Sequence, residues 1–137
     1  MLNRLAVYLA ALFLAAPLCS AHSAGECSLK SIKGSYGFEL KGTNMTVGTY
    51  VLVGRFSANG SGQFGGTGIQ SVNGKIHKST FKGTYSVDRD CTGAVQLVFP
   101  NSGVTGSLYF VLVAGGREIY MVDSGGGTVE SGSAKRQ

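Results

Sequence analysis

Apolar and polar residues alternate along most of the chain after residue 25, in short runs separated by Gly, Asn, Asp and Ser. Alternation with a period of two is typical of β-strands that bury one face. No stretch of this region repeats apolar residues at helical spacing over several turns, so we expect no long helix. Leu29 and Ile32 allow one short helical turn after Cys27. The pattern predicts an all-β fold.

Gly/Asn/Asp/Ser punctuation divides this region into strands. The strongest hairpin signal is Asn73-Gly74, because a two-residue type I′ turn needs positive φ at both positions. Every link is short, so successive strands should pair antiparallel, and a meander of this length is expected to close because closure removes exposed edges. The prediction is a small antiparallel meander closed into an eight-stranded barrel. Its strands are expected at 35–41, 47–58, 62–72, 75–87, 94–99, 104–114, 117–123 and 128–134.

A β-sandwich of the immunoglobulin kind is the alternative. The absence of Trp and the position of Cys27, before the first strand, both disfavour it. Glycines within the strands fit strong coiling and bulges in a tight barrel. They are Gly48, Gly54, Gly65, Gly66, Gly68, Gly83 and Gly106. The interior of an eight-stranded barrel is either filled by side chains or holds one small ligand.

Residues 1–24 have the layout of a cleavable secretory signal peptide. Asn3-Arg4 gives a positive start, 5–16 is wholly apolar, and small residues follow Pro17. Cleavage is expected near 21–24, and the apolar run is shorter than the roughly 20 residues that a membrane span needs. Short Gly-rich strands and the lack of a C-terminal aromatic also speak against an outer-membrane barrel. We expect a soluble, secreted or periplasmic protein that is a monomer, with a single domain of residues 25–137.

Removal of the signal peptide leaves two cysteines, Cys27 and Cys91. Two cysteines in an oxidising compartment pair by default, so we predict a disulfide between them. Neither cysteine has a histidine at zinc-ligand spacing, so no metal site is predicted.

The rest of the chain carries eleven basic and seven acidic side chains, a net charge of +4. The positive charges are scattered, and the nearest approach to a cluster is Lys75, Lys78 and Lys82 within one predicted strand. A nucleic-acid footprint would be denser and interleaved with aromatic residues. We therefore expect no nucleic-acid partner, and the charge fits solubility and weak attraction to anionic surfaces.

The sequence resembles a family of small exported, functionally uncharacterised bacterial proteins. The resemblance is carried by the segment that starts at Cys27 and runs to Phe38, by Val53-Gly-Arg-Phe56, by Gly83-Thr-Tyr-Ser-Val87 and by Asp90-Cys-Thr-Gly93. It covers nearly all of residues 25–137. It implies a calycin-like barrel similar to that of allene oxide cyclase, and it brings no catalytic residues or cofactor.

Candidate chemistry is sparse. His77 is the only histidine after residue 25, and no Gly-x-Ser-x-Gly elbow supports a catalytic triad around it. The glycine-rich run 60–68 lacks the Lys-[Ser/Thr] ending and the helix of a phosphate loop, so it indicates a hairpin. Glu39 and Glu118 lie within apolar strands; an inward one would need a partner such as Arg55 or Arg117, whereas an outward one is ordinary surface, which we favour.

The aromatic side chains in the strands are the residues best suited to contact a small ligand. A mixed Tyr, Phe and Val interior with a few polar tips suits a small-ligand cavity, and it equally suits a filled core. The candidate ligand-binding residues are Tyr36, Phe38, Tyr50, Arg55, Tyr85 and Tyr109.

Three functions follow from these observations. The first is an exported barrel that binds a small apolar or amphipathic molecule. The second is a structural or interaction module of the cell envelope with a filled barrel. The third is a cyclase- or isomerase-type enzyme, for which the fold alone is a weak argument, so we favour a protein that is not an enzyme and has no cofactor.

Overall fold

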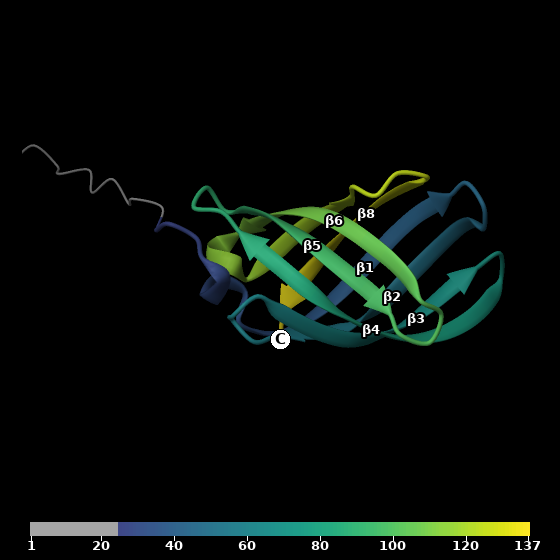
Figure 1. Cartoon of the computed structure of the whole chain (residues 1–137), viewed down its shortest axis with the longest axis horizontal. Helices are drawn as coiled ribbons and strands as arrows, with labels where there is room; N and C mark the ends of the chain where they lie inside the picture. Colours follow the sequence, from purple (N-terminus) through teal and green to yellow (C-terminus); the bar gives the residue numbers. More distant parts are fainter. Residues whose placement is uncertain (1–24) are drawn as a thin grey trace, which may run out of the picture.

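The strands close into a barrel (Figure 1). The computed structural model describes residues 25–137, and each strand in it pairs antiparallel with its neighbours in the chain. The pairing of β1 with β8 completes the barrel, which confirms the predicted eight-stranded meander and not the sandwich. The strands are β1 (Gly34–Asn44), β2 (Gly48–Ala58), β3 (Gln63–Val72), β4 (Lys75–Val87), β5 (Thr92–Phe99), β6 (Val104–Val113), β7 (Glu118–Asp123) and β8 (Thr128–Arg136).

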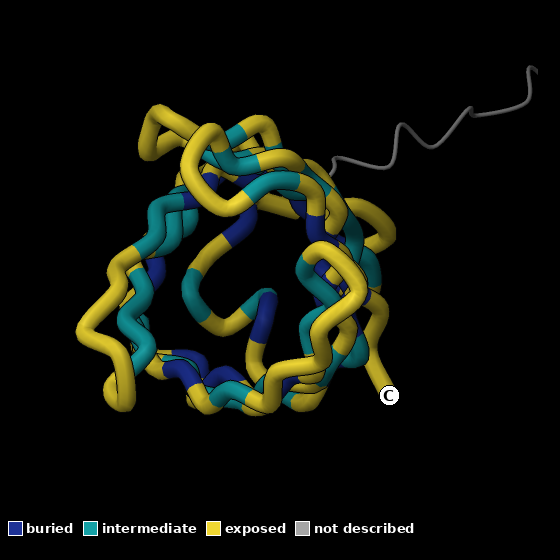
Figure 2. Tube along the Cα trace, turned by 90° about the vertical axis from the view of Figure 1, so that its right-hand side faces the viewer, coloured by how far each residue is buried: buried dark blue, intermediate teal, exposed yellow. Residues whose placement is uncertain are grey.

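The two ends of the barrel differ. At one end lie two short 3-10 turns, η1 (Leu29–Ile32) and η2 (Ala114–Gly116), and η1 is the helical turn that the sequence predicts. They touch, because a Cβ on Gly116 would lie 2.1 Å from the carbonyl oxygen of Ser31. We call this the closed end. The links that follow β1, β3, β5 and β7 form the open end, and an end-on view shows the strands as a continuous cylinder (Figure 2).

A disulfide fastens the chain at the closed end. Cys27 and Cys91 are bonded, as predicted; they are 64 positions apart in the sequence, and their Cα atoms are 4.9 Å apart. The backbone N–H of Cys27 also donates to the carbonyl of Arg89, 3.2 Å away. In the chain-entropy model a loop of this length contributes about 4 kcal/mol to stability. The bridge therefore ties the segment before η1 to the turn between β4 and β5.

Large inward side chains face glycines on the adjacent strand. Side chains alternate between the two faces of a strand, so paired positions point to the same side of the barrel wall. The register pairs Phe38 with Gly54, Phe56 with Gly66, Phe64 with Gly83, and Phe110 with Gly93. A Cβ on Gly54 would lie 3.0 Å from the Phe38 ring and 2.2 Å from the carbonyl oxygen of Thr67. The in-strand glycines that we attributed to coiling thus also make room for the rings inside a narrow barrel.

All eight strands of the described residues belong to one closed barrel. Within residues 25–137, no helix has the length and apolar character needed to cross a membrane. The predicted signal peptide and its cleavage site near 21–24 lie outside the described residues.

Candidate ligand-binding cavity

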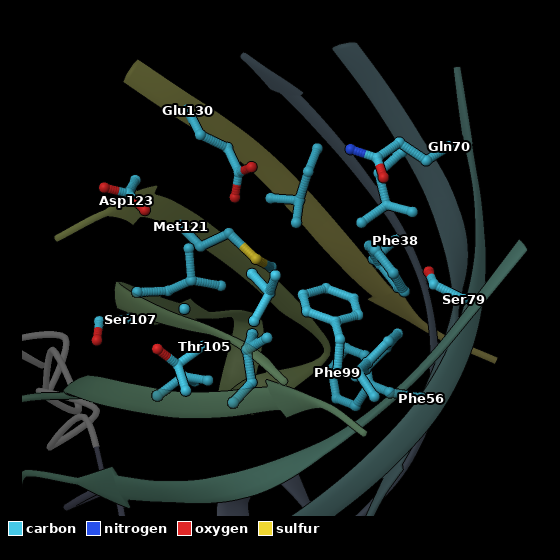
Figure 3. A pocket seen from close by; sticks show the side chains of 18 of the residues that line it. Phe38, Phe56, Gln70, Ser79, Phe99, Thr105, Ser107, Met121, Asp123 and Glu130 are labelled. Carbon is cyan, nitrogen blue, oxygen red and sulfur yellow. The ribbon is translucent and has the colours of Figure 1, made fainter. Parts of the chain in front are cut away.

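The interior of the barrel holds a cavity of about 700 Å³ (Figure 3). It extends from Ile32 of η1 at the closed end to Asn44 and Asn101 at the open end. Cavities of this size are typical of sites for small organic molecules. The barrel interior is therefore hollow rather than filled.

Phenylalanine rings make the apolar part of the cavity wall. Phe81 contacts both Phe38 and Phe99, with ring centroids 5.7 and 6.1 Å apart. Phe56 contacts Phe64 at 5.9 Å, and the rings in both groups meet at steep angles. Edge-to-face pairs of this kind are favourable beyond the area they bury. They hold the rings in fixed positions and leave the space beside them open.

Tyr36 seals the closed end behind these rings. It is 0% exposed, stacks on Phe56 at 5.1 Å and does not line the cavity. Its hydroxyl donates to the carbonyl of Gly116 and accepts from Arg136 Nη2 at 2.8 Å. Arg136 Nη2 also donates to the carbonyl of Ser31 at 2.8 Å. Tyr36 therefore joins β1, β8 and the two 3-10 turns, which is a structural role.

The opposite part of the cavity is polar and contains a half-buried carboxylate. Tyr50 on β2 donates a hydrogen bond from its hydroxyl to Glu130 on β8, across the intervening strand β1. Gly42 of β1 is the register partner of both residues, so the three lie at one level of the barrel. A Cβ on Gly42 would lie 3.0 Å from the Cβ of Glu130 and 2.6 Å from the carbonyl oxygen of Val129. The glycine gives Tyr50 the space to reach Glu130.

This environment changes the acidity of both groups. Burial raises the pKa of Glu130 above its ordinary value, and the nearby charge of Asp123 raises it further. The hydrogen bond from Tyr50 acts in the opposite direction. Burial, the bond to Glu130 and the two neighbouring carboxylates raise the pKa of the Tyr50 hydroxyl far above its usual range. Tyr50 is thus a fixed hydrogen-bond donor, whereas Glu130 holds its proton more tightly than an ordinary glutamate does.

The structure distributes the six candidate residues over three places. Phe38, Tyr50 and Tyr85 line the cavity. The Tyr85 hydroxyl donates to the carbonyl of Leu29 at 3.1 Å and so also holds η1. Tyr36 lies behind the cavity, as described above. Arg55 and Tyr109 lie on the outer face, where Tyr109 is 61% exposed, so neither contributes to the cavity wall.

Sequence reasoning considered two acidic residues within apolar strands and missed Glu130. Glu39 lies on the outer face, where Lys41 contacts it at 2.9 Å, as we favoured. Glu118 contacts Lys135 at 3.5 Å. The signal for Glu130 was its alternation with Gly132 and Ala134, two small residues that fit an inward face close to another strand.

The comparisons place the fold among solved barrels. No family model matches the sequence, and no curated protein matches it. Among solved structures, the redesigned β-barrel mFAP1 bound to DFHBI aligns with a TM-score of 0.57 at 13% identity, over 79% of this chain and 97% of that one. The redesigned barrel b11L5F_LGL aligns at 0.56 and 14% identity, over 80% and 94% of the two chains. The redesigned barrel mFAP0, also bound to DFHBI, aligns at 0.52 and 14% identity, over 77% and 99%.

These similarities define the class of fold. The chain is an eight-stranded antiparallel β-barrel with an interior cavity. At such low identity the likeness to the redesigned barrels concerns the fold alone.

Proposed function

We propose that the protein is an exported barrel that binds one small apolar or amphipathic molecule in its cavity. The observation that carries this proposal is a cavity of about 700 Å³ with a phenylalanine wall and a few polar groups near its open end. A structural module with a filled interior would not need such a space. Two of the redesigned barrels of similar fold are described as bound to DFHBI, which supports the capacity of this architecture for a small guest.

The export part of the proposal rests on residues 1–24 and on the disulfide. The Cys27–Cys91 bridge is compatible with an oxidising compartment outside the cytoplasm. The resemblance to small exported bacterial proteins points the same way. Mass spectrometry of the protein recovered from periplasmic and culture fractions tests this: a new N-terminus near 21–24 supports export, and an intact N-terminus in the cytoplasmic fraction contradicts it.

Binding is tested with N-phenyl-1-naphthylamine, a neutral apolar dye whose emission rises in apolar surroundings. We expect saturable binding of one dye per barrel. Leu97→Trp fills the cavity, because Leu97 lines it, and should weaken binding by about tenfold or more. Val98→Trp is the matched control on the same strand, at a position outside the cavity lining.

Far-UV circular dichroism checks that both variants fold. Absence of saturable dye binding to the unaltered protein would overturn the proposal. Equal weakening by the two tryptophan variants would also contradict it, because the dye would then bind elsewhere.

A further inference from the structure

Two carboxylates share one wall of the cavity near its open end. Glu130 comes from β8 and Asp123 from the end of β7, and both line the cavity. The last register pair of these strands is Val122 with Ser131, so Asp123 and Glu130 occupy the next positions along the two strands. Figure 3 shows their side chains near each other, with Gln70 and Ser79 on another part of the wall. The cavity therefore has a distinct acidic side.

No basic side chain within residues 25–137 forms an ion pair with this side. The ion pairs within residues 25–137 use Glu26, Glu39 and Glu118. Glu130 accepts a hydrogen bond only from the neutral Tyr50 hydroxyl, and Asp123 accepts one from the backbone N–H of Gly125 at 2.9 Å. A half-buried carboxylate without a counter-charge is costly to keep ionised. A cationic group on a ligand would remove that cost.

The basic residues that line the cavity lie elsewhere. His77 and Lys78 are on β4, which is four strands from β8 in an eight-stranded barrel. The two strands therefore occupy opposite walls. Both basic residues are exposed to solvent at the open end. They leave the acidic side free for a guest.

The hydroxyl of Ser79, in another part of the cavity wall, lacks a hydrogen-bond partner among the described residues. Its Oγ atom exposes less than 1 Å². Buried hydroxyls are nearly always hydrogen-bonded, and an exception calls for an explanation. Ser79 lines the same cavity, but an oxygen this little exposed is out of reach of a guest unless its side chain rotates.

We propose that the cavity selects amphipathic amines, which place their apolar body against the phenylalanine rings and their protonated nitrogen beside Glu130 and Asp123. This inference rests on the proposed function, because it names the ligand class of the same cavity. Tyr50 assists by fixing the orientation of the Glu130 carboxylate. The amine is held by charge-assisted hydrogen bonds, which are about twice as strong as neutral ones.

Three probes with one apolar body test the inference. They are 2-(1-naphthyl)ethylamine, 2-(1-naphthyl)ethanol and 1-naphthylacetate, each titrated calorimetrically at mildly alkaline pH. We expect the amine to bind about tenfold or more tighter than the alcohol, because a hydrogen bond to a charged group contributes more than a neutral one. The acetate should bind weakest, because it brings a third negative charge to the acidic side.

Glu130→Gln should abolish the preference for the amine, and far-UV circular dichroism checks that the variant folds. Glu39→Gln, on the outer face, is the matched control and should keep the preference. If the alcohol binds as tightly as the amine, or if Glu130→Gln keeps the preference, the amine inference is overturned and the proposed function stands. If none of the three probes binds, the amine inference is overturned, and the dye titration described above decides the proposed function.

Discussion

Gly42 faces Tyr50 on one side and Glu130 on the other in the strand register. The tyrosine hydroxyl can bond a carboxylate two strands away only because the residue between them has no side chain. The same arrangement recurs deeper in the barrel, where rings face glycines. At Gly42, however, the space serves a polar contact rather than an aromatic one. The absence of a Cβ at Gly42 thus permits the Tyr50–Glu130 hydrogen bond on the acidic side of the cavity.

Replacing Gly42 by alanine should lower the free energy of unfolding by about 1–3 kcal/mol, because overpacking forces neighbouring atoms to move. The new Cβ would lie 2.6 Å from the backbone oxygen of Val129, which cannot yield without shifting β8. Gly37→Ala on the same strand is the control, since its Cβ would meet only the side chain of Gln137, at 3.2 Å. Urea unfolding compares the two variants, and equal stabilities would contradict this role for Gly42.

The raised pKa of Glu130 predicts a pH-dependent stability. Burial is the main cause and the charge of Asp123 adds to it, so the folded protein holds the Glu130 proton more tightly than the unfolded chain does. Stability should therefore fall as pH rises from the ordinary glutamate pKa through the raised one. Glu130→Gln should remove this fall. Tyr50→Phe should move it to higher pH, because the hydrogen bond from Tyr50 lowers the pKa of Glu130 and its removal lets that pKa rise further.

Urea midpoints measured between about pH 4 and pH 8 follow this change. Glu39→Gln serves as the control, because Glu39 lies on the outer face beside Lys41. A slope that persists in Glu130→Gln would show that another group causes it.

Strand β8 joins the two ends of the barrel. Its first part carries Glu130 into the cavity, and its last residue, Arg136, bonds Tyr36 and Ser31 at the closed end. The sequence predicts a strand that stops at 134, because Lys135, Arg136 and Gln137 have no apolar alternation. Pairing with β1 and the bonds of Arg136 extend it. Contacts between distant elements therefore set the end of this strand, and local sequence does not.

Arg136→Ala should lower the free energy of unfolding by about 1–3 kcal/mol, because it removes charge-assisted hydrogen bonds to Tyr36 and to the carbonyl of Ser31. Lys135→Ala is the matched control. Its side chain is 74% exposed and forms only a surface ion pair with Glu118, which contributes little. Thermal unfolding measures both variants. A Lys135→Ala loss as large as that of Arg136→Ala would contradict the assignment.

For the whole molecule, short links and period-two alternation were enough to predict a closed barrel, and the two cysteines that follow the signal-like segment were enough to predict its disulfide. They were not enough to predict whether the barrel is hollow. That depends on how ring and glycine positions combine around the wall, and hence on the register of every strand pair. Phe38, Tyr50 and Tyr85 were found because each sits in a strongly alternating strand.

Glu130 could not be found in the same way. In its strand the large apolar residue is Val129, which by pattern alone belongs inside. The register with β1 instead leaves Val129 79% exposed and turns Glu130 inward. An outward valine beside an inward glutamate reverses the usual rule, so the small residues Gly132 and Ala134 were a weaker signal than Val129, and tertiary pairing decides the orientation.

The pairing of β1 with β8 also sets when the cavity comes into existence. Tyr36 and Arg136 are 100 positions apart, and Tyr50 and Glu130 are 80 apart. Contacts this distant in sequence form late and slowly, after the local hairpins. A chain that has folded as far as β7 would still expose the edges of β1 and β7 and would lack Glu130. A guest that binds beside Glu130 would thus favour the closed barrel over every partly folded form, and would act as a selective stabiliser of completed molecules.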